Sequence, residues 1–226
     1  MRPDPAVGVF DTLLVRHGVP VDLDAHMDRL CRSVAELYDV PVDVAGLGAR
    51  LGADVAGMRT ARVRTTYDPT DGRWEIHATP VEEPGLEPRV VTVCCVPGGL
   101  GPHKWVDRSP IEAFGDPREL LLVDEHDLLL EAGSANVFVV LDGVVLTPPV
   151  DGRILPGTVR ARVVERLGAH GRRVEERAPT IPDLVASQEV FTTSSVRGVQ
   201  PVVGCTGLGS WPAGPVTAWL RQIPEM

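Results

Sequence analysis

Glycine and proline interrupt this chain so often that only short helices and strands can form between them. The 226 residues include 23 glycines and 21 prolines, and both types break regular secondary structure. Between these breaks, some segments alternate apolar and polar residues, and others repeat apolar residues every three or four positions. The sequence therefore predicts an α+β fold of hairpins and meanders with a few helices.

The two periodicities locate the predicted elements. The first helix is expected to begin after a cap at Asp22 or Asp24 and to run to about Tyr38. Further helices are expected at residues 42–56, 109–114, 158–170 and 215–221. Strands are expected at residues 7–15, 60–67, 73–79, 89–96, 119–124, 128–131, 136–141, 144–147, 173–177, 189–193 and 200–203. Asp142-Gly143 is a hairpin turn signal between two of these strands.

The length fits one large domain or two small domains. Residues 97–102, which read Pro-Gly-Gly-Leu-Gly-Pro, form the best candidate for a linker. We therefore predict an N-terminal α/β domain over residues 1–97 and a C-terminal domain over residues 98–226.

Charge and composition exclude several classes of protein. The formal net charge is −9, so the chain lacks the basic footprint of a general nucleic-acid binder. No run of 18 apolar residues predicts a transmembrane helix, and the first ten residues do not resemble a signal peptide. The four cysteines show no metal-ligand spacing. These features predict a cytoplasmic protein without nucleic acid, membrane or metal as a partner.

The basic residues are divided unevenly between their two types. Lysine and arginine together number 22, and Lys104 is the one lysine among them. A GC-rich genome favours arginine codons, and arginine replaces lysine well as a surface charge. It does not replace lysine as an amine nucleophile, because the guanidinium group stays protonated. Lys104 is therefore a candidate for amine chemistry, and a chance surface lysine is the alternative.

Two segments carry groups suited to binding an anion. Residues 155–160 place a Pro-Gly turn directly before a predicted helix, whose first N–H groups and dipole attract phosphate. Thr158 is the predicted cap of that helix and a further hydroxyl donor. Residues 192–195, Thr-Thr-Ser-Ser, follow a strand and offer clustered hydroxyl groups. An ordinary helix cap and an ordinary polar loop are the alternatives.

Two other segments carry charged groups suited to a substrate or a ring. Glu131 ends an apolar run, and a buried carboxylate requires a partner such as a protonated ring nitrogen or an arginine. Asn136 begins the next buried strand. Arg62 and Arg64 share one face of a predicted strand, and paired guanidinium groups suit a substrate carboxylate. The alternatives are a solvated strand end for Glu131 and a solvent-exposed face for the arginines.

A single amine, two candidate phosphate sites and a buried acid together match the needs of pyridoxal phosphate (PLP). The cofactor requires an amine for a Schiff base, a cradle for its phosphate and an acid for its ring nitrogen. Sequence motifs of dinucleotide-binding loops, P-loops and serine hydrolases are absent.

Several short motifs occur in the order and spacing of one enzyme family. Residues 10–12 are similar to F-E-T, 26–30 to H-x-x-R-L, 131–138 to E-x-x-x-x-N-x-F, 147–149 to T-P-P, and 155–160 to L-P-G-I/T-x-R. Together they resemble the class-IV aminotransferases, which are PLP enzymes of fold type IV. That family includes branched-chain and D-amino-acid aminotransferases and 4-amino-4-deoxychorismate lyases.

The resemblance implies a fold and a set of residue roles. It implies a small N-terminal α/β domain, a larger C-terminal pseudo-barrel domain that binds the cofactor, and a homodimer. Lys104 would form the Schiff base and transfer protons, and Glu131 would contact the ring nitrogen. The other cofactor-binding residues would be Arg29, Asn136, Thr158, Val159, Ser194 and Ser195. Arg62 and Arg64 would bind the carboxylate of a small, amino-acid-like substrate.

The substrate prediction rests on finer similarities. Residues 104–108 resemble the K-x-x-D/N-R pattern of the lyases, Arg62 and Arg64 resemble their R-x-R strand, and Ser109 stands where branched-chain aminotransferases carry tyrosine. We therefore predict a 4-amino-4-deoxychorismate lyase, which releases pyruvate and forms 4-aminobenzoate for folate synthesis. The alternatives are an aminotransferase for branched-chain or D-amino acids, a non-catalytic member of the family, and an unrelated binding domain. Because the chain begins close to Phe10, we expect the family's usual longer N-terminal segment to be shortened.

Overall fold

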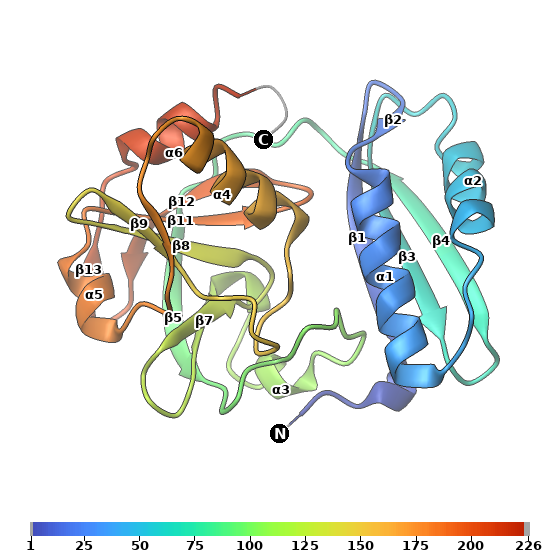
Figure 1. The fold of residues 1–226 in the computed structure, drawn as a ribbon, viewed down its shortest axis with the longest axis horizontal. Helices are drawn as coiled ribbons and strands as arrows, with labels where there is room; N and C mark the ends of the chain where they lie inside the picture. The colour runs from blue at the N-terminus through green and yellow to red at the C-terminus, as the bar shows by residue number, and fades with distance from the viewer. Residues whose placement is uncertain (1, 224–226) are drawn as a thin grey trace. The chain divides into compact units, whose positions relative to one another are not determined.

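The computed structural model of the protein describes residues 2–223, which divide into two compact units (Figure 1). The small unit contains Arg2–Pro84 and His103–Arg108, and the large unit contains Gly85–Pro102 and the chain from Ser109 onward. The predicted division after residue 97 falls inside a segment of the large unit. The assignment of folding domains to residues 1–97 and 98–226 stays a prediction.

The small unit is an antiparallel sheet with helices packed on one face. Its strands are β1 (Val9–Arg16), β2 (Val19–Pro20), β3 (Thr60–Asp68) and β4 (Arg73–Pro80), in the order β2-β1-β3-β4. Its helices are α1 (Leu23–Tyr38) and α2 (Val44–Asp54), and a 3-10 turn covers Pro5–Val7. Alternate residues of β1 and β3, such as Leu13 and Val63, pack against Met27 of α1 and Leu51 of α2. The predicted elements of this half are confirmed within two residues of their bounds.

The predicted cap of the first helix is confirmed in position but not in its hydrogen bond. Asp22 occupies the N-cap position of α1, but its backbone is left-handed with φ 52°, and its side chain makes no capping hydrogen bond. Asp24 lies within the first turn, where its charge favours the positive end of the helix dipole. The next helix, α2, does have a side-chain cap: Asp43 accepts a hydrogen bond from the Gly46 N–H at 2.9 Å.

The large unit is built on one mixed sheet, with strand order β10-β9-β8-β11-β12-β5-β6-β7 and β13 paired to β12. The strands are β5 (Arg89–Cys95), β6 (Leu120–Val123), β7 (Leu129–Ala132), β8 (Asn136–Leu141), β9 (Val144–Thr147), β10 (Val174–Glu176), β11 (Glu189–Ser194), β12 (Gly198–Cys205) and β13 (Gly209–Ser210). β5 runs parallel to both β12 and β6. The predicted turn at Asp142-Gly143 is confirmed, since both residues have the positive φ that a type I′ hairpin requires.

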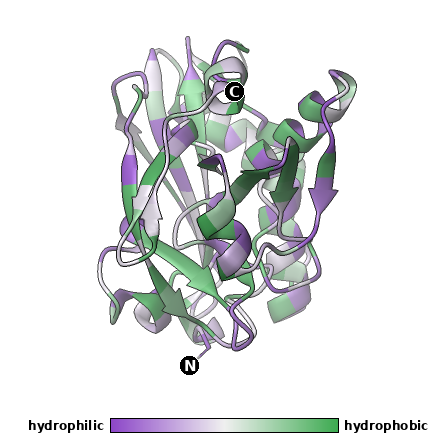
Figure 2. Ribbon diagram, turned by 90° about the vertical axis from the view of Figure 1, so that its left-hand side faces the viewer, coloured by the Kyte–Doolittle hydropathy of each residue, from purple (hydrophilic) through white to green (hydrophobic). Residues whose placement is uncertain are grey.

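Neighbouring residues of each central strand point into different apolar clusters. On β8, Val137 and Val139 pack in one cluster together with Leu184, whereas Phe138 packs in another with Val163. The helices that accompany the sheet are α3 (Ser109–Glu112), α4 (Thr158–Ala169), α5 (Ile181–Ala186) and α6 (Pro215–Leu220). Several strands are green, and thus hydrophobic, along most of their length in Figure 2. Burial on both faces explains these near-continuous apolar runs.

The sequence patterns did not predict α5. This helix has six residues, fewer than two turns, so apolar periodicity cannot reveal it. Its signal is a capping box, in which Thr180 and Asp183 each accept a hydrogen bond from the other residue's N–H, with proline in the first turn.

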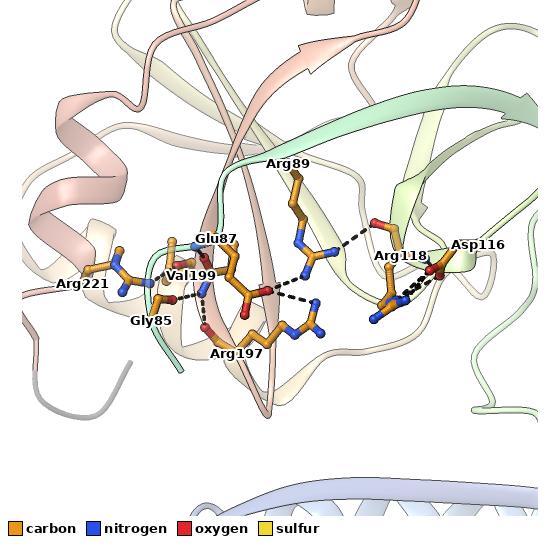
Figure 3. A network of polar contacts seen from close by, with 9 residues as sticks. Gly85, Glu87, Arg89, Asp116, Arg118, Arg197, Val199 and Arg221 are labelled. Carbon is orange, nitrogen blue, oxygen red and sulfur yellow. Dashed lines mark hydrogen bonds and ion pairs between the residues drawn. The ribbon is translucent and has the colours of Figure 1, made fainter. Parts of the chain in front are cut away.

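A polar network fastens the chain where it enters the large unit (Figure 3). The buried Gln200 side chain donates to the Gly85 and Arg197 carbonyl oxygens at 2.9 and 2.8 Å, and it accepts from the Glu87 N–H at 2.8 Å. Arg89 and Arg197 both reach the Glu87 carboxylate. The entry segment is thereby held beside β12.

The predicted linker at residues 97–102 is an ordered loop. Leu100 is buried in an apolar cluster of the large unit, and the Gly101 N–H donates to the Arg153 carbonyl oxygen at 3.2 Å. A Cβ atom on Gly99 would lie 2.2 Å from the same oxygen, and its φ is +74°. Glycine is therefore required by a close approach of two backbones.

A buried carboxylate fixes α6 to the sheet. Glu189 of β11 accepts hydrogen bonds from the Val216 and Thr217 N–H groups at 3.0 and 2.5 Å. We expect Glu189→Gln to lower the free energy of unfolding by about 1–3 kcal/mol, because an amide donor would face a backbone donor. Urea denaturation measures this change. The exposed Glu119→Gln is the matched control, and an equal loss in both variants would contradict the role of Glu189.

Candidate active site

Lys104 lies on a short extended segment that pairs with the start of β1. The Phe10 N–H donates to the Lys104 carbonyl oxygen at 2.8 Å, and the Val106 N–H donates to the Gly8 carbonyl oxygen at 3.0 Å. Trp105 is buried among Val9, Leu30, Val34 and Tyr67. Since side chains alternate along an extended segment, Lys104 points away from that cluster, and its Nζ lies 5.2 Å from the centre of the Phe10 ring.

The surroundings of Lys104 disfavour its charged form. The pKa of Lys104 is lowered to about 8, mainly by burial; the negative charge of Asp11 opposes this shift, and Arg29, Arg108 and Arg64 add to it. A lysine with a pKa near neutrality supplies a free amine more readily than an ordinary surface lysine. The half-buried side chain thus has the electrostatic setting of a nucleophilic amine.

Arg29 of α1 is held by a buried carboxylate. Its Nε and Nη2 atoms donate to the two carboxylate oxygens of Asp11, each at 2.9 Å. His26 Nδ1 donates to the same carboxylate at 2.7 Å, because an ionised carboxylate only accepts. Burial alone would raise the pKa of Asp11, but Arg29, His26 and Lys104 together hold it well below its usual range. One edge of the Arg29 guanidinium group is therefore fixed.

His103 links the Lys104 segment to the same helix. Its Nδ1 lies 3.0 Å from Ser33 Oγ, and Ser33 Oγ donates its hydrogen to the Arg29 carbonyl oxygen at 3.0 Å. Since the hydroxyl hydrogen is already used, His103 Nδ1 is the donor and carries the proton. Burial lowers the pKa of His103, which favours the neutral ring.

Arg64 and Arg62 occupy one face of β3, as their spacing predicts. The Arg64 guanidinium carbon lies 3.7 Å from the centre of the Phe10 ring, a stacked cation–π contact. Burial lowers the pKa of Arg64, with further contributions from Arg62 and Arg108. Arg62 is exposed, and Arg64 is half-buried. Arg64 is thus the better placed of the two to meet a ligand near Lys104.

In the large unit, the backbone of Leu155 joins the two predicted polar residues. Glu131 of β7 is buried and accepts a hydrogen bond from the Leu155 N–H at 3.2 Å. Asn136, the first residue of β8, donates from Nδ2 to the Leu155 carbonyl oxygen at 2.9 Å. The two side chains that the sequence singled out are therefore brought to one loop, which leads into α4.

The start of α4 has no side-chain cap. Gly157 is the N-cap residue and Thr158 is the first helical residue, so the prediction that Thr158 caps the helix is wrong. Val159 places its side chain in the core while its amide belongs to the first turn. Arg160 donates to the Pro148 carbonyl oxygen at 2.7 Å and to Glu176 at 2.8 Å, which fixes the helix start against the loop after β9.

A buried hydroxyl group without a partner lies beside Asn136. Thr193 of β11 is the cross-strand partner of Asn136, and within residues 2–223 its Oγ1 has no hydrogen-bond partner. Ser194 ends β11, and Ser195 follows it in the turn that leads to β12. An anion with several acceptor oxygens would satisfy both the hydroxyl group and the uncapped helix start. These residues therefore fit the phosphate of PLP.

The predicted residues fall into two groups, one in each unit. The small unit brings together Lys104, Arg29 and Arg64, and Arg62 lies two residues from Arg64 on the same face. The large unit brings together Glu131, Asn136 and the first turn of α4. Ser194 and Ser195 lie at the end of the strand next to β8. These placements leave the catalytic and binding roles of the predicted residues as proposals.

Sequence patterns did not assign roles to three residues that these groups use. Asp11 was seen only as part of a motif, and its bond to Arg29 joins a strand to a helix. His103 had its neighbour Lys104 as its one signal. Leu155 contributes only backbone atoms, which no residue pattern reveals.

Comparison with known proteins relates the chain to one family. A model for amino-transferase class IV matches residues 112–205. A branched-chain-amino-acid aminotransferase of Arabidopsis thaliana is 41% identical over 119 residues, which cover 49% of this chain and 29% of that enzyme. D-alanine aminotransferase of Bacillus licheniformis is 27% identical over 93% of this chain and 83% of its own length.

Solved structures agree over nearly the whole length. A fold IV transaminase of Curtobacterium pusillum matches with a TM-score of 0.83 and 26% identity, covering 96% of this chain and 85% of its own. The 4-amino-4-deoxychorismate lyase of Pseudomonas aeruginosa matches with a TM-score of 0.78 and 25% identity, covering 96% and 89%. Residues 112–205 match the class-IV aminotransferase family, and the chain has the fold of a fold IV transaminase. The predicted α+β fold of fold type IV is thereby confirmed.

An aminotransferase of Brucella abortus with 21% identity and a TM-score of 0.80 was solved with PLP bound. Within the described part of this chain, no helix is long and apolar enough to cross a membrane. Residues 2–223 also contain no cluster of histidine, cysteine or acidic side chains that could hold a metal ion.

A substitution at Gly157 tests the geometry at the start of α4. A Cβ atom there would lie 1.9 Å from Asn136 Oδ1, so we expect Gly157→Ala to displace Asn136 and destabilise the protein by about 1–3 kcal/mol. Gly168 lies in the same helix with nothing within 4 Å of its Cβ position. Gly168→Ala is the matched control and should stabilise the protein by up to about 1 kcal/mol. Thermal denaturation measures both, and equal signs would contradict this geometry.

A substitution at Lys104 tests the lowered pKa of this side chain. Its pKa is about 8 in the folded chain against 10.5 for an ordinary lysine, so the unfolded chain binds more protons between these values. The penalty of charging Lys104 is therefore complete below pH 8 and disappears as the pH rises to about 10.5. We expect Lys104→Met to raise the urea midpoint at pH 7, without added PLP, and to lose this gain near pH 10.5. A gain that is independent of pH would contradict the lowered pKa.

Proposed function

We propose that this chain is a PLP-dependent aminotransferase that acts on a small amino acid. The observation that carries the proposal is the setting of Lys104, the one lysine of the sequence. It is half-buried, its pKa is lowered to about 8, and charged side chains act on it from several elements. Similarity to known proteins supports the same conclusion, since the relatives that match most of this chain's length include aminotransferases.

The residues of the chain suit the three ends of the cofactor. Arg29, the first-turn amides of Thr158 and Val159, and the Ser194–Ser195 hydroxyl groups would hold the phosphate, and Asn136 would shape the loop before α4. Glu131 would accept a hydrogen bond from the ring nitrogen and keep that nitrogen protonated. When bound, PLP supplies an aldehyde that condenses with amines and a ring that withdraws electrons from them.

Lys104 would then act as the proton carrier. Its free amine removes the proton from the substrate carbon beside the amino group and returns a proton at the end of the transfer. A pKa near 8 suits both directions, because the amine gains and loses a proton at little cost near neutral pH. Arg64 would bind the substrate carboxylate, with Arg62 as a second cation on the same face of β3.

The lyase stays a second candidate because particular residues favour it. Lys104, Asp107 and Arg108 follow the lyase pattern, and Arg62 and Arg64 match its paired arginines. The likeness to the Pseudomonas aeruginosa lyase adds support. However, the sequence relatives include branched-chain-amino-acid and D-alanine aminotransferases, so amino transfer is the function we propose first. We also propose a homodimer, which size-exclusion chromatography with light scattering tests.

The first experiment combines absorbance with covalent trapping. We expect the purified chain with PLP to absorb visible light, and borohydride reduction should leave a pyridoxyl mass on the peptide that contains Lys104. Lys104→Arg keeps the positive charge but lacks the amine, so it should lose the adduct and at least about 1000-fold of the activity. An unchanged rate in that variant would overturn the proposal.

Product analysis then separates the two candidate reactions. An aminotransferase converts a branched-chain or D-amino acid and a 2-oxo acid into a new amino acid and a new 2-oxo acid. A lyase releases pyruvate from 4-amino-4-deoxychorismate with no amino acceptor. Pyruvate release alone would replace the first candidate by the second, and the absence of both reactions would favour a non-catalytic member of the family.

A further inference from the structure

We propose that Asp11 is a positioning residue of the reaction, which orients the Arg29 guanidinium group and supplies the negative charge that balances the cations around Lys104. This inference rests on the proposed function, since it assigns a role beside the amine that the reaction would use. The sequence predictions gave Asp11 no role.

The Asp11 carboxylate is saturated by donors from the surrounding chain. Arg29 donates to both oxygens at 2.9 Å, and Oδ1 also accepts from His26 Nδ1 at 2.7 Å and from the Thr12 N–H at 2.6 Å. Both Asp11 and Arg29 are buried. A bidentate pair of this kind fixes the plane of a guanidinium group as well as its position. Arg29 can therefore present only one orientation to a ligand.

Asp11 is joined to Lys104 through the backbone as well as by charge. The residue before Asp11, Phe10, donates its N–H to the Lys104 carbonyl oxygen. The charged groups with the largest effects on Lys104 are Asp11 and three cations, Arg29, Arg108 and Arg64. Asp11 supplies the negative charge among them. Without it, the ammonium form of Lys104 would lose the charge that opposes these three guanidinium groups.

Burying the charges of Asp11 and Arg29 costs free energy, which indicates that the pair does more than stabilise the fold. A buried ion pair contributes little to stability compared with apolar residues of the same volume. Its benefit lies in fixing one geometry and one charge state. Asp11 keeps the lysine pKa close to neutrality instead of letting three neighbouring cations lower it further.

The chain's one lysine makes a direct test possible. We would incorporate ¹³C-labelled lysine into the full-length chain, strip any bound PLP, and follow the single Lys104 signal by NMR from pH 5 to 11. Asp11→Asn should lower the pKa of Lys104 by about one unit, because a nearby opposite charge is removed. Asp43→Asn is the matched control: it changes the same group in the same unit, at the N-cap of α2, where the asparagine Oδ1 can still accept the Gly46 N–H bond. It should leave the Lys104 pKa unchanged.

The outcomes separate positioning from simple structural damage. Equal shifts in Asp11→Asn and Asp43→Asn, or a shift below about 0.3 units in Asp11→Asn, would overturn the proposal. Should Asp11→Asn fail to fold because Arg29 is left as an unpaired buried charge, the pair Arg29→Gln and Asp11→Asn/Arg29→Gln carries the same comparison. The lower Lys104 pKa is then expected in the double variant, and equal values overturn the proposal.

A second measurement addresses the orientation of Arg29. The ratio of the affinities for PLP and for pyridoxal isolates the contribution of the phosphate. We expect Asp11→Asn to reduce this ratio by about tenfold, the effect of one misdirected charge-assisted hydrogen bond. An unchanged ratio would remove the orienting role. A wild-type chain that binds no PLP would refute the proposed function, while the lysine titration would still decide whether Asp11 balances the charge on Lys104.

Discussion

The pairing of the Lys104 segment with the start of β1 is the contact on which the arrangement of the small unit depends. Two backbone hydrogen bonds, at Phe10 and at Gly8, hold the segment in an extended conformation. Gly8 also lies against the end of β3, where glycine is required because its φ is +101° and a Cβ atom would lie 2.3 Å from the Tyr67 carbonyl oxygen. Once the segment is extended, Trp105 enters the core and Lys104 must point the other way. The geometry of the amine thus follows from backbone pairing.

In the large unit, backbone hydrogen bonds likewise fix the positions of polar side chains. The backbone of Leu155 connects Glu131 on β7 with Asn136 on β8, and the loop continues into the uncapped first turn of α4. Arg160 fastens the same turn from the other side. Polar groups from two strands are therefore fixed relative to one helix start. Rigid placement of this kind is what binding a phosphate requires, since the donors must already point at the ligand.

Features that depend on neighbouring residues were predicted from the sequence, whereas features that depend on residues far apart in the chain were not. The strands β8 and β9 match their predicted bounds, since apolar runs and an Asp-Gly turn are local signals. The cap of α4 was predicted wrongly, and Asp22 at the N-cap of α1 makes no capping hydrogen bond, because an aspartate or threonine near a helix start does not reveal its φ angle or its exact position. Helix α5 was missed because six residues carry too little periodicity. No role was predicted for Asp11, because the side chains that bind it lie on another element.

The sequence alone determined the chemical inventory: one amine at Lys104, a carboxylate at Glu131 that ends an apolar run, and motifs whose order resembles that of the class-IV aminotransferases. Residue type and spacing are sufficient for these because each is encoded within a few consecutive positions. Only the tertiary structure decided which groups meet. Asp11 neutralises Arg29 and opposes the cations around Lys104, and the resulting pKa depends on burial and on charges brought together from separate elements.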